Sequence, residues 1–232
     1  AGEAGILPND IILEADGVEL TDMNTNEVVN LIRGPKDSEV VLLIQRNNST
    51  FEVTLVRATI PNITVTGEID ETESTVGHIK ISQFADNTYN ELVETISELR
   101  KEGAKSLIID LRMNPGGLLD SALDIGNMFL EDGDMIMQIS ERNADEASKF
   151  TANERAFGSF KITEPYVLLI DEGSASASEI VAAAVQENTD AKLIGQTSFG
   201  KGTVQTILNP SDLGELKLTS AKWLTPSGNW IH

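Results

Sequence analysis

The pattern of hydrophobic and polar residues along this chain changes close to residue 58. Before it, apolar runs at 11–13 and 40–44 and the alternating segment 51–56 predict short strands. Asn24 or Thr25 can cap a helix over 27–33 that stops at Gly34. We therefore expect residues 1–58 to form a small αβ domain.

A linker through residues 60–62 leads into a second, larger domain, expected over residues 59–232. Strand-like segments at 77–81, 107–111, 166–170 and 191–194 alternate with helical patterns over 87–101, from 118 to 129 and after 176. This alternation favours an α/β fold with a largely parallel sheet covered by helices on both faces. After residue 200 the pattern becomes β-rich, with strands expected at 203–208 and 215–223.

Composition narrows the chemistry mainly through the residue types that are scarce. The chain has 37 acidic and 17 basic residues and a net charge of −20, which argues against nucleic acid and anionic membranes as partners. It has no cysteine and only two histidines, His78 and His232, so neither a thiol nucleophile nor a zinc site is expected. A hydrolase of this composition would use a base other than histidine, with no metal or organic cofactor.

The first candidate site is the segment 171–180, DEGSASASEI, which follows an apolar strand and precedes an apolar helix. Ser176 and Glu179 have the spacing of a capping box, in which the serine would be only a helix cap. The same corner suits a nucleophile, because sites of parallel sheets form where strands end and helix N-termini offer N–H groups to an anion. Both interpretations stay open from these residues alone.

Two further segments carry candidate chemistry. In Gly200-Lys201-Gly202 the glycines leave the lysine stem uncrowded, and Gln205 follows four residues later on the same face. The pair Gly116-Gly117, at a strand–helix junction, can direct N–H groups into one concavity as an oxyanion hole. The alternatives are an exposed loop lysine and a tight turn.

A nucleotide-binding loop is a rival interpretation of the same lysine. Residues 195–201 match the first seven positions of a P-loop. The eighth position needs Ser or Thr to hold magnesium, and Gly202 stands there. The segment that follows, 203–208, is β-branched instead of helical, which disfavours nucleotide binding.

Taken together, the segments 110–118, 173–179 and 199–205 resemble the carboxy-terminal processing proteases, tail-specific serine–lysine peptidases of the S41 type. The resemblance implies a ClpP/crotonase-like α/β core, C-terminally truncated in this sequence. It also implies roles by position. Those roles are Ser176 as nucleophile, Lys201 as general base, Gln205 as the group that orients the base, and the backbone N–H of Ala177 with that of Gly116 or Gly117 as oxyanion hole. Ser174 and Ser178 would serve packing and capping.

The segments 5–12, 15–17 and 26–34 resemble a PDZ domain that is incomplete at its N-terminus. Such a domain would recognise substrate C-termini, and its helix would supply Val28, Val29 and Ile32 to the groove. The resemblance further implies a regulatory adaptor, a homo-oligomer, and residence outside the cytoplasmic membrane in the bacterial cell envelope. The open alternatives are a small αβ packing module and a non-catalytic peptide-binding protein with a degenerate hydrolase core.

Overall fold

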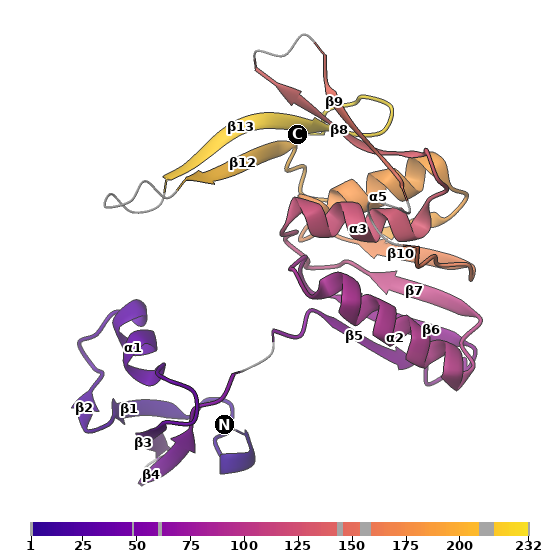
Figure 1. Ribbon diagram of the computed structural model, residues 1–232. Helices are drawn as coiled ribbons and strands as arrows, with labels where there is room; N and C mark the ends of the chain where they lie inside the picture. Colours follow the sequence, from indigo (N-terminus) through magenta and orange to yellow (C-terminus); the bar gives the residue numbers. More distant parts are fainter. Residues whose placement is uncertain are drawn as a thin grey trace. The chain divides into compact units, whose positions relative to one another are not determined.

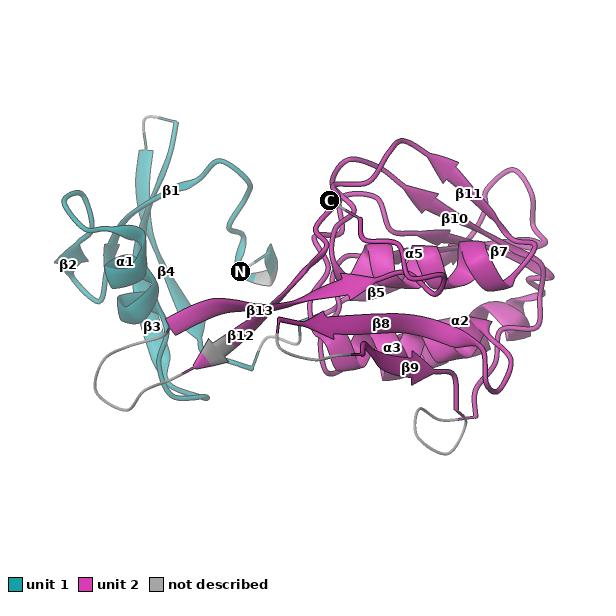
Figure 2. Cartoon of the chain, turned by 90° about the horizontal axis from the view of Figure 1, so that it is seen from above, with its two compact units in different colours: residues 1–62 teal, residues 63–232 magenta. Residues whose placement is uncertain are grey.

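The computed structural model covers residues 1–232 and describes residues 2–47, 49–59, 62–142, 146–153, 159–208 and 216–231. The chain divides into two compact units, residues 1–62 and 63–232 (Figure 2). Ile60 and Pro61 of the expected linker, Glu215 at the start of the last expected strand, and His232 lie outside the described residues.

Unit 1 is an antiparallel sheet with one helix. The strands are β1 (Ile11–Ala15), β2 (Val18–Glu19), β3 (Glu39–Arg46) and β4 (Ser49–Val56), in the order β2-β1-β3-β4. A 3-10 turn, η1 (Gly2–Ala4), precedes them, and helix α1 (Thr25–Ile32) lies between β2 and β3 in the chain.

Helix α1 begins where the sequence predicts it. Asn24 is the N-cap: its Oδ1 accepts the N–H of Glu27 at 3.1 Å, and Glu27 Oε2 accepts the N–H of Asn24 at 2.8 Å. The helix packs on a core to which β3 contributes every second residue, Val40, Leu42 and Ile44. Burial of alternate residues is the period of a strand with one face covered.

Unit 2 is built on a five-stranded sheet in the order β11-β10-β7-β6-β5. Its strands are β5 (Val65–Ile69), β6 (Val76–Ile81), β7 (Ser106–Asp110), β10 (Tyr166–Ile170) and β11 (Lys192–Gly195). Figure 1 labels four of these strands, β10, β7, β6 and β5. All neighbours pair in parallel except β5 with β6, which is antiparallel. The α/β fold with a mostly parallel sheet is as the sequence predicts.

The helices of unit 2 differ from expectation in their placement. Helix α2 (Thr88–Glu102) packs on β5 and β6, α3 (Leu119–Phe129) contacts α2 and α5, and α5 (Ala177–Asn188) contacts β11. They cover one face, whereas the other face carries Thr66, Glu68 and Lys80, which are exposed. From β6 to β11, each successive strand of this sheet is added on the same side of the one before it. Right-handed crossover connections then place the connecting helices on one face. The expectation of two covered faces was wrong for the described residues.

A second sheet of unit 2 is antiparallel and has the order β12-β13-β8-β9. Its strands are β8 (Met135–Glu141), β9 (Ser148–Thr151), β12 (Thr203–Leu208) and β13 (Leu216–Leu224). Helices α3 and α5 lie between the two sheets in Figure 1, and both contact β8. Strand β12, at one edge of this sheet, begins two residues after Lys201.

Two classes of feature are absent from the part of the chain that is described. No helix there combines the length and the apolar character that crossing a bilayer requires. Within the same residues, no three side chains of His, Cys, Asp or Glu come together as a metal-binding group.

Candidate active site

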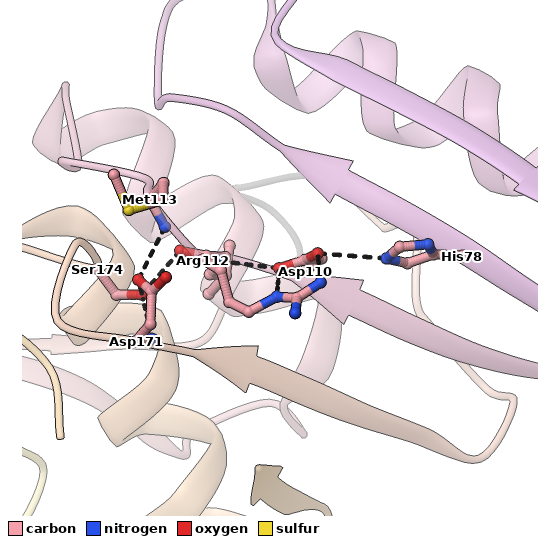
Figure 3. Close-up of polar contacts among 7 residues, drawn as sticks. His78, Asp110, Arg112, Met113, Asp171 and Ser174 are labelled. Atoms are coloured by element: carbon pink, nitrogen blue, oxygen red, sulfur yellow. Dashed lines mark hydrogen bonds and ion pairs between the residues drawn. The ribbon is translucent and has the colours of Figure 1, made fainter. Parts of the chain in front are cut away.

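Two neighbouring strands of the parallel sheet deliver the loops of the candidate site. Strand β7 ends at Asp110 and β10 ends at Ile170. Asp110 pairs with Leu169 in the parallel ladder, so the two strands end at the same level of the sheet. The two loops are then joined by Asp171, whose Oδ1 accepts the N–H of Met113 at 2.8 Å (Figure 3). The same oxygen accepts the N–H of Gly173 at 2.9 Å. One side chain therefore fixes the loop after β7 to the loop after β10.

Asp110 anchors the start of the first loop and is 1% exposed. Its carboxylate accepts hydrogen bonds from Nε of Arg112 at 2.9 Å and from Nη2 at 2.6 Å (Figure 3). His78 Nε2 lies 3.3 Å from Oδ2. Burial raises the pKa of Asp110, but the hydrogen bonds and charge of Arg112, with a contribution from His78, outweigh it and lower the pKa below its usual value. Asp110 is therefore an ionised, structural carboxylate.

The three serines of the second loop have different environments. Ser174 Oγ donates to the carbonyl of Leu111 at 2.8 Å, and Ser178 Oγ donates to the carbonyl of Asn114 at 3.0 Å. Both side chains are fully buried and tie the two loops together. Ser176 is less buried and lines a cavity. Only the middle serine of the described corner is thus placed to meet a substrate.

Ser176 also has an unusual backbone conformation, with φ 56° and ψ −112°. Positive φ is costly for a residue with a Cβ, about 1–3 kcal/mol in sparsely populated regions, and such residues gather at functional sites. The residue is the N-cap of α5, so the predicted helix start is correct. The turn directs the serine toward the cavity before the helix begins.

The two glycines after β7 are closely packed, Gly116 against the serine corner and Gly117 against the backbone of Phe84. A Cβ on Gly116 would lie 2.5 Å from the carbonyl oxygen of Ala175 and 2.8 Å from the Ser176 Cβ. A Cβ on Gly117 would collide with the carbonyl of Phe84. Both have positive φ, 94° and 151°. Close backbone approach, together with left-handed φ, therefore requires glycine at both positions.

The N–H groups of the two glycines are not equivalent. Gly116 donates its N–H to Oδ1 of the buried Asn114 at 2.9 Å. Gly117 and Ala177 both line the cavity, and among the hydrogen bonds of the described residues neither donates its backbone N–H to a protein acceptor. Of the two glycines that the sequence offers, Gly117 is the one with a donor available.

Glu179 joins the serine corner to the lysine loop. It is 3% exposed, and its carboxylate accepts four hydrogen bonds. Oε2 accepts the backbone N–H of Ser176 at 2.7 Å and that of Lys201 at 2.9 Å. Oε1 accepts the N–H of Gly200 at 2.6 Å and the hydroxyl of Ser198 at 2.8 Å. The capping-box spacing indicated the first of these bonds, and nothing local in the sequence indicated the other three.

One cavity of about 280 Å³ brings the candidate residues together. Its lining includes Gly117, Ser176, Ala177, Lys201 and Gln205. The remaining lining residues are mostly apolar: Leu118, Leu119, Ile180, Thr203, Val204, Lys217 and Trp223. Every site residue that the sequence predicts in this unit lies at the cavity except Gly116, which lies directly behind Ser176.

Lys201 does not sit in a nucleotide-binding loop. A P-loop must open a helix, whereas β12 begins at Thr203. The structure therefore removes the rival interpretation.

In unit 1 the proposed groove residues are placed on α1. Val28 and Ile32 pack, partly buried, against the core of this unit, and Val29 is half-buried. Ile32 also lines an open cavity of about 550 Å³. Its other lining residues are mainly apolar and come from β1, β3 and β4, from Ile6, and from the residues that follow α1 and β4.

Comparison with known proteins agrees with this fold. The model of peptidase family S41 matches residues 75–232, and a PDZ-domain model matches residues 1–46. A peptidase domain preceded by a segment that matches a PDZ domain is thus the class of protein. Because the first match covers more than half of the sequence, the chain belongs to peptidase family S41.

Individual relatives point the same way. The chain is 43% identical over its whole length to carboxy-terminal processing protease CtpA of Bacillus subtilis and 37% identical to a carboxyl-terminal-processing protease of Synechocystis, covering 48% and 54% of those proteins. It spans about half the length of the curated relatives it matches. Among solved structures, the photosystem II D1 C-terminal processing protease superposes with a TM-score of 0.63 at 26% identity, covering all of this chain and 62% of that one.

Proposed function

We propose that this chain is the catalytic part of a serine endopeptidase that cleaves protein substrates through an acyl-enzyme on Ser176. The observation that carries the proposal is the convergence of Ser176, Lys201 and two available N–H groups on one cavity. Family membership and relatives named as processing proteases support it.

In the first half of the reaction, Ser176 Oγ attacks the carbonyl carbon of the scissile peptide bond. The neutral amine of Lys201 takes the hydroxyl proton, and Gln205 orients that amine. The negatively charged oxygen of the tetrahedral intermediate accepts hydrogen bonds from the N–H groups of Ala177 and Gly117. By analogy with known oxyanion holes, each bond lowers the activation free energy by roughly 3–4 kcal/mol.

The intermediate then collapses: the C–N bond breaks, Lys201 gives the proton to the leaving amine of the C-terminal fragment, and the N-terminal fragment stays on Ser176 as an ester. Water then attacks the ester, again with Lys201 as base, and releases the N-terminal fragment and Ser176. The nucleophile needs no histidine in this scheme.

Unit 1 would select the substrate. We propose that the PDZ domain to which residues 1–46 belong binds the C-terminal tail of a protein, with Val28, Val29 and Ile32 on α1 beside the groove. Adaptor proteins and a homo-oligomer are further proposed partners, and the cell envelope the proposed location. Fractionation of cells that carry the tagged full-length protein tests the location.

The function is tested by incubating the purified chain with a denatured protein and with fluorogenic peptides ending in apolar tails. Ser176→Ala and Lys201→Ala are each expected to abolish cleavage while the circular dichroism spectrum stays unchanged. Full activity of Ser176→Ala would rule the mechanism out. Tight peptide binding by the wild-type chain without any cleavage would instead favour a non-catalytic peptide-binding protein.

A further inference from the structure

The backbone of the loop that carries Lys201 accepts hydrogen bonds from two indole groups. Trp223 Nε1 donates to the carbonyl of Lys201 at 2.7 Å, and Trp230 Nε1 donates to the carbonyl of Gly202 at 2.8 Å. These are the only two tryptophans in the sequence. They come from β13 and from the segment after it, about 20 to 30 residues beyond the loop.

Lys201 is thereby held on both sides of its Cα. Its N–H donates to Glu179 Oε2 at 2.9 Å, and its carbonyl accepts from Trp223. The next carbonyl, of Gly202, accepts both Trp230 Nε1 and the backbone N–H of Trp223, the latter at 3.2 Å. With both peptide planes fixed, only the side-chain torsions of Lys201 remain to be set at the cavity.

The packing around Gly202 agrees with a loop held in place. A Cβ on this glycine would collide with the carbonyl of Ile231 and come within 2.5 Å of Trp230 Nε1. The segment that contains Trp230 therefore lies directly on Gly202. The ring of Trp230 is also covered by the ammonium of Lys222, 3.7 Å from its centre, in cation–π geometry.

We propose that Trp223 is a positioning residue for Lys201 and that Trp230 is a weaker, second support of the same loop. The inference rests on the proposed function, in which Lys201 is the base. Trp223 is 1% exposed and lines the cavity beside Lys201. A buried indole N–H needs an acceptor, and here that acceptor is the main chain of the base itself.

The alternative role for Trp223 is that of core packing alone, and the N–H group separates the two. A ring without the donor fills the same volume, so packing would be kept while the hydrogen bond to Lys201 is lost. Benzothienylalanine, in which sulfur replaces the indole N–H, is such a ring. Trp223 and Trp230 can each be replaced by it in turn, with 5-fluorotryptophan as the analogue that keeps the donor.

Peptide cleavage by the full chain is measured for each replacement, with kcat and KM determined separately. Loss of the donor at Trp223 is expected to lower kcat about fivefold to tenfold and to leave KM within about twofold, since one hydrogen bond is worth roughly 1 kcal/mol. At Trp230 the change is expected to stay below about twofold, because Gly202 keeps the N–H of Trp223. 5-Fluorotryptophan is expected to leave kcat within about twofold.

An unchanged kcat for the donor-free Trp223 protein, in a chain whose Ser176→Ala variant is inactive, would overturn the inference and leave the proposed function standing. Activity in Ser176→Ala would overturn the function instead. Should the analogue fail to fold, Trp223→Phe is the second variant, with the same expected fall in kcat. Independently, indole ¹⁵N NMR of the wild-type chain must show the Trp223 proton exchanging slowly with solvent. Exchange as fast as in the unfolded chain would overturn the contact.

Discussion

The backbone N–H groups of Ser176 and Lys201 donate to the same oxygen atom, Oε2 of Glu179, at 2.7 and 2.9 Å. The candidate nucleophile and the candidate base are 25 residues apart in sequence, yet one buried carboxylate oxygen fixes the distance between their main chains. The geometry of the site therefore depends on Glu179 as much as on the reacting groups.

Glu179→Gln tests this dependence. The amide keeps one acceptor oxygen and turns an NH₂ group toward two of the four donors, so at least two buried N–H or O–H groups lose their acceptor. We expect kcat/KM to fall at least about tenfold and the free energy of unfolding of unit 2 to fall by roughly 1–3 kcal/mol. Urea unfolding followed by tryptophan fluorescence reports on unit 2, because Trp223 and Trp230 both lie there.

Glu98→Gln is the matched control for that experiment, because Glu98 is exposed on α2. It is expected to change neither quantity by more than about 0.5 kcal/mol or twofold. If Glu179→Gln behaved like Glu98→Gln, Glu179 would have no role in holding the two loops.

Gly117→Ala tests the oxyanion hole by steric means. The added Cβ would collide with the carbonyl of Phe84, so the loop that carries the Gly117 N–H would have to shift. We expect kcat/KM to fall by about 100-fold or more, the order of losing one oxyanion donor. Gly103→Ala controls for backbone strain: it has φ 104° but open space around the Cβ, so stability should fall by about 1 kcal/mol with activity retained. Equal activities of the two variants would contradict the assignment.

Gln205→Ala tests the group proposed to orient the base. Gln205 lies at the cavity, on the opposite side of β12 from Thr206. We expect kcat to fall roughly tenfold with KM little changed, as a less well-oriented base lowers the rate of proton transfer. Thr206→Ala, one position along the same strand, is expected to leave kcat within about twofold. A normal kcat in Gln205→Ala would remove Gln205 from the mechanism.

Arg112→Met tests whether Arg112 lowers the pKa of Asp110 at the start of the first loop. The lowered pKa of Asp110 means that this group stabilises the fold above the ordinary aspartate pKa of 3.8 and loses that contribution as pH falls below it. Without Arg112, burial becomes the dominant effect and raises the pKa of Asp110. The loss of stability on acidification should then begin at higher pH.

At neutral pH the same variant should lose roughly 2 kcal/mol of unfolding free energy, less than for a fully buried pair because Arg112 is half-exposed. Unfolding free energies of unit 2 between about pH 3 and 7 check both effects, with exposed Arg142→Met as control. If the unfolding free energy of the variant fell with decreasing pH over the same range as that of the wild type, this account of Asp110 would be contradicted.

The local features of the site could be read from the sequence because they depend on neighbouring residues. The strand over 166–170, the small residues that follow it and the capping-box spacing predict the corner at Ser176. The glycine pair at 116–117 likewise follows a predicted strand. Scarcity of histidine directed attention to Lys201, and its flanking glycines marked the loop.

What the sequence left undetermined depends on contacts between distant segments. Three of the four bonds to Glu179 come from residues 198–201, and the indole donors come from Trp223 and Trp230. Strand order was equally hidden: alternating strands and helices predict a parallel sheet but not its direction of growth. That direction decided that the helices cover one face.

The central claim is that Ser176 forms an ester with substrate, and trapping that ester tests it most directly. The wild-type chain would be mixed with an activated peptide ester, quenched in acid at early times, digested and analysed by mass spectrometry. We predict one acyl group, located on Ser176, that fails to accumulate in Lys201→Ala. An acyl group on another residue, or equal acylation of Ser176→Ala, would contradict the account.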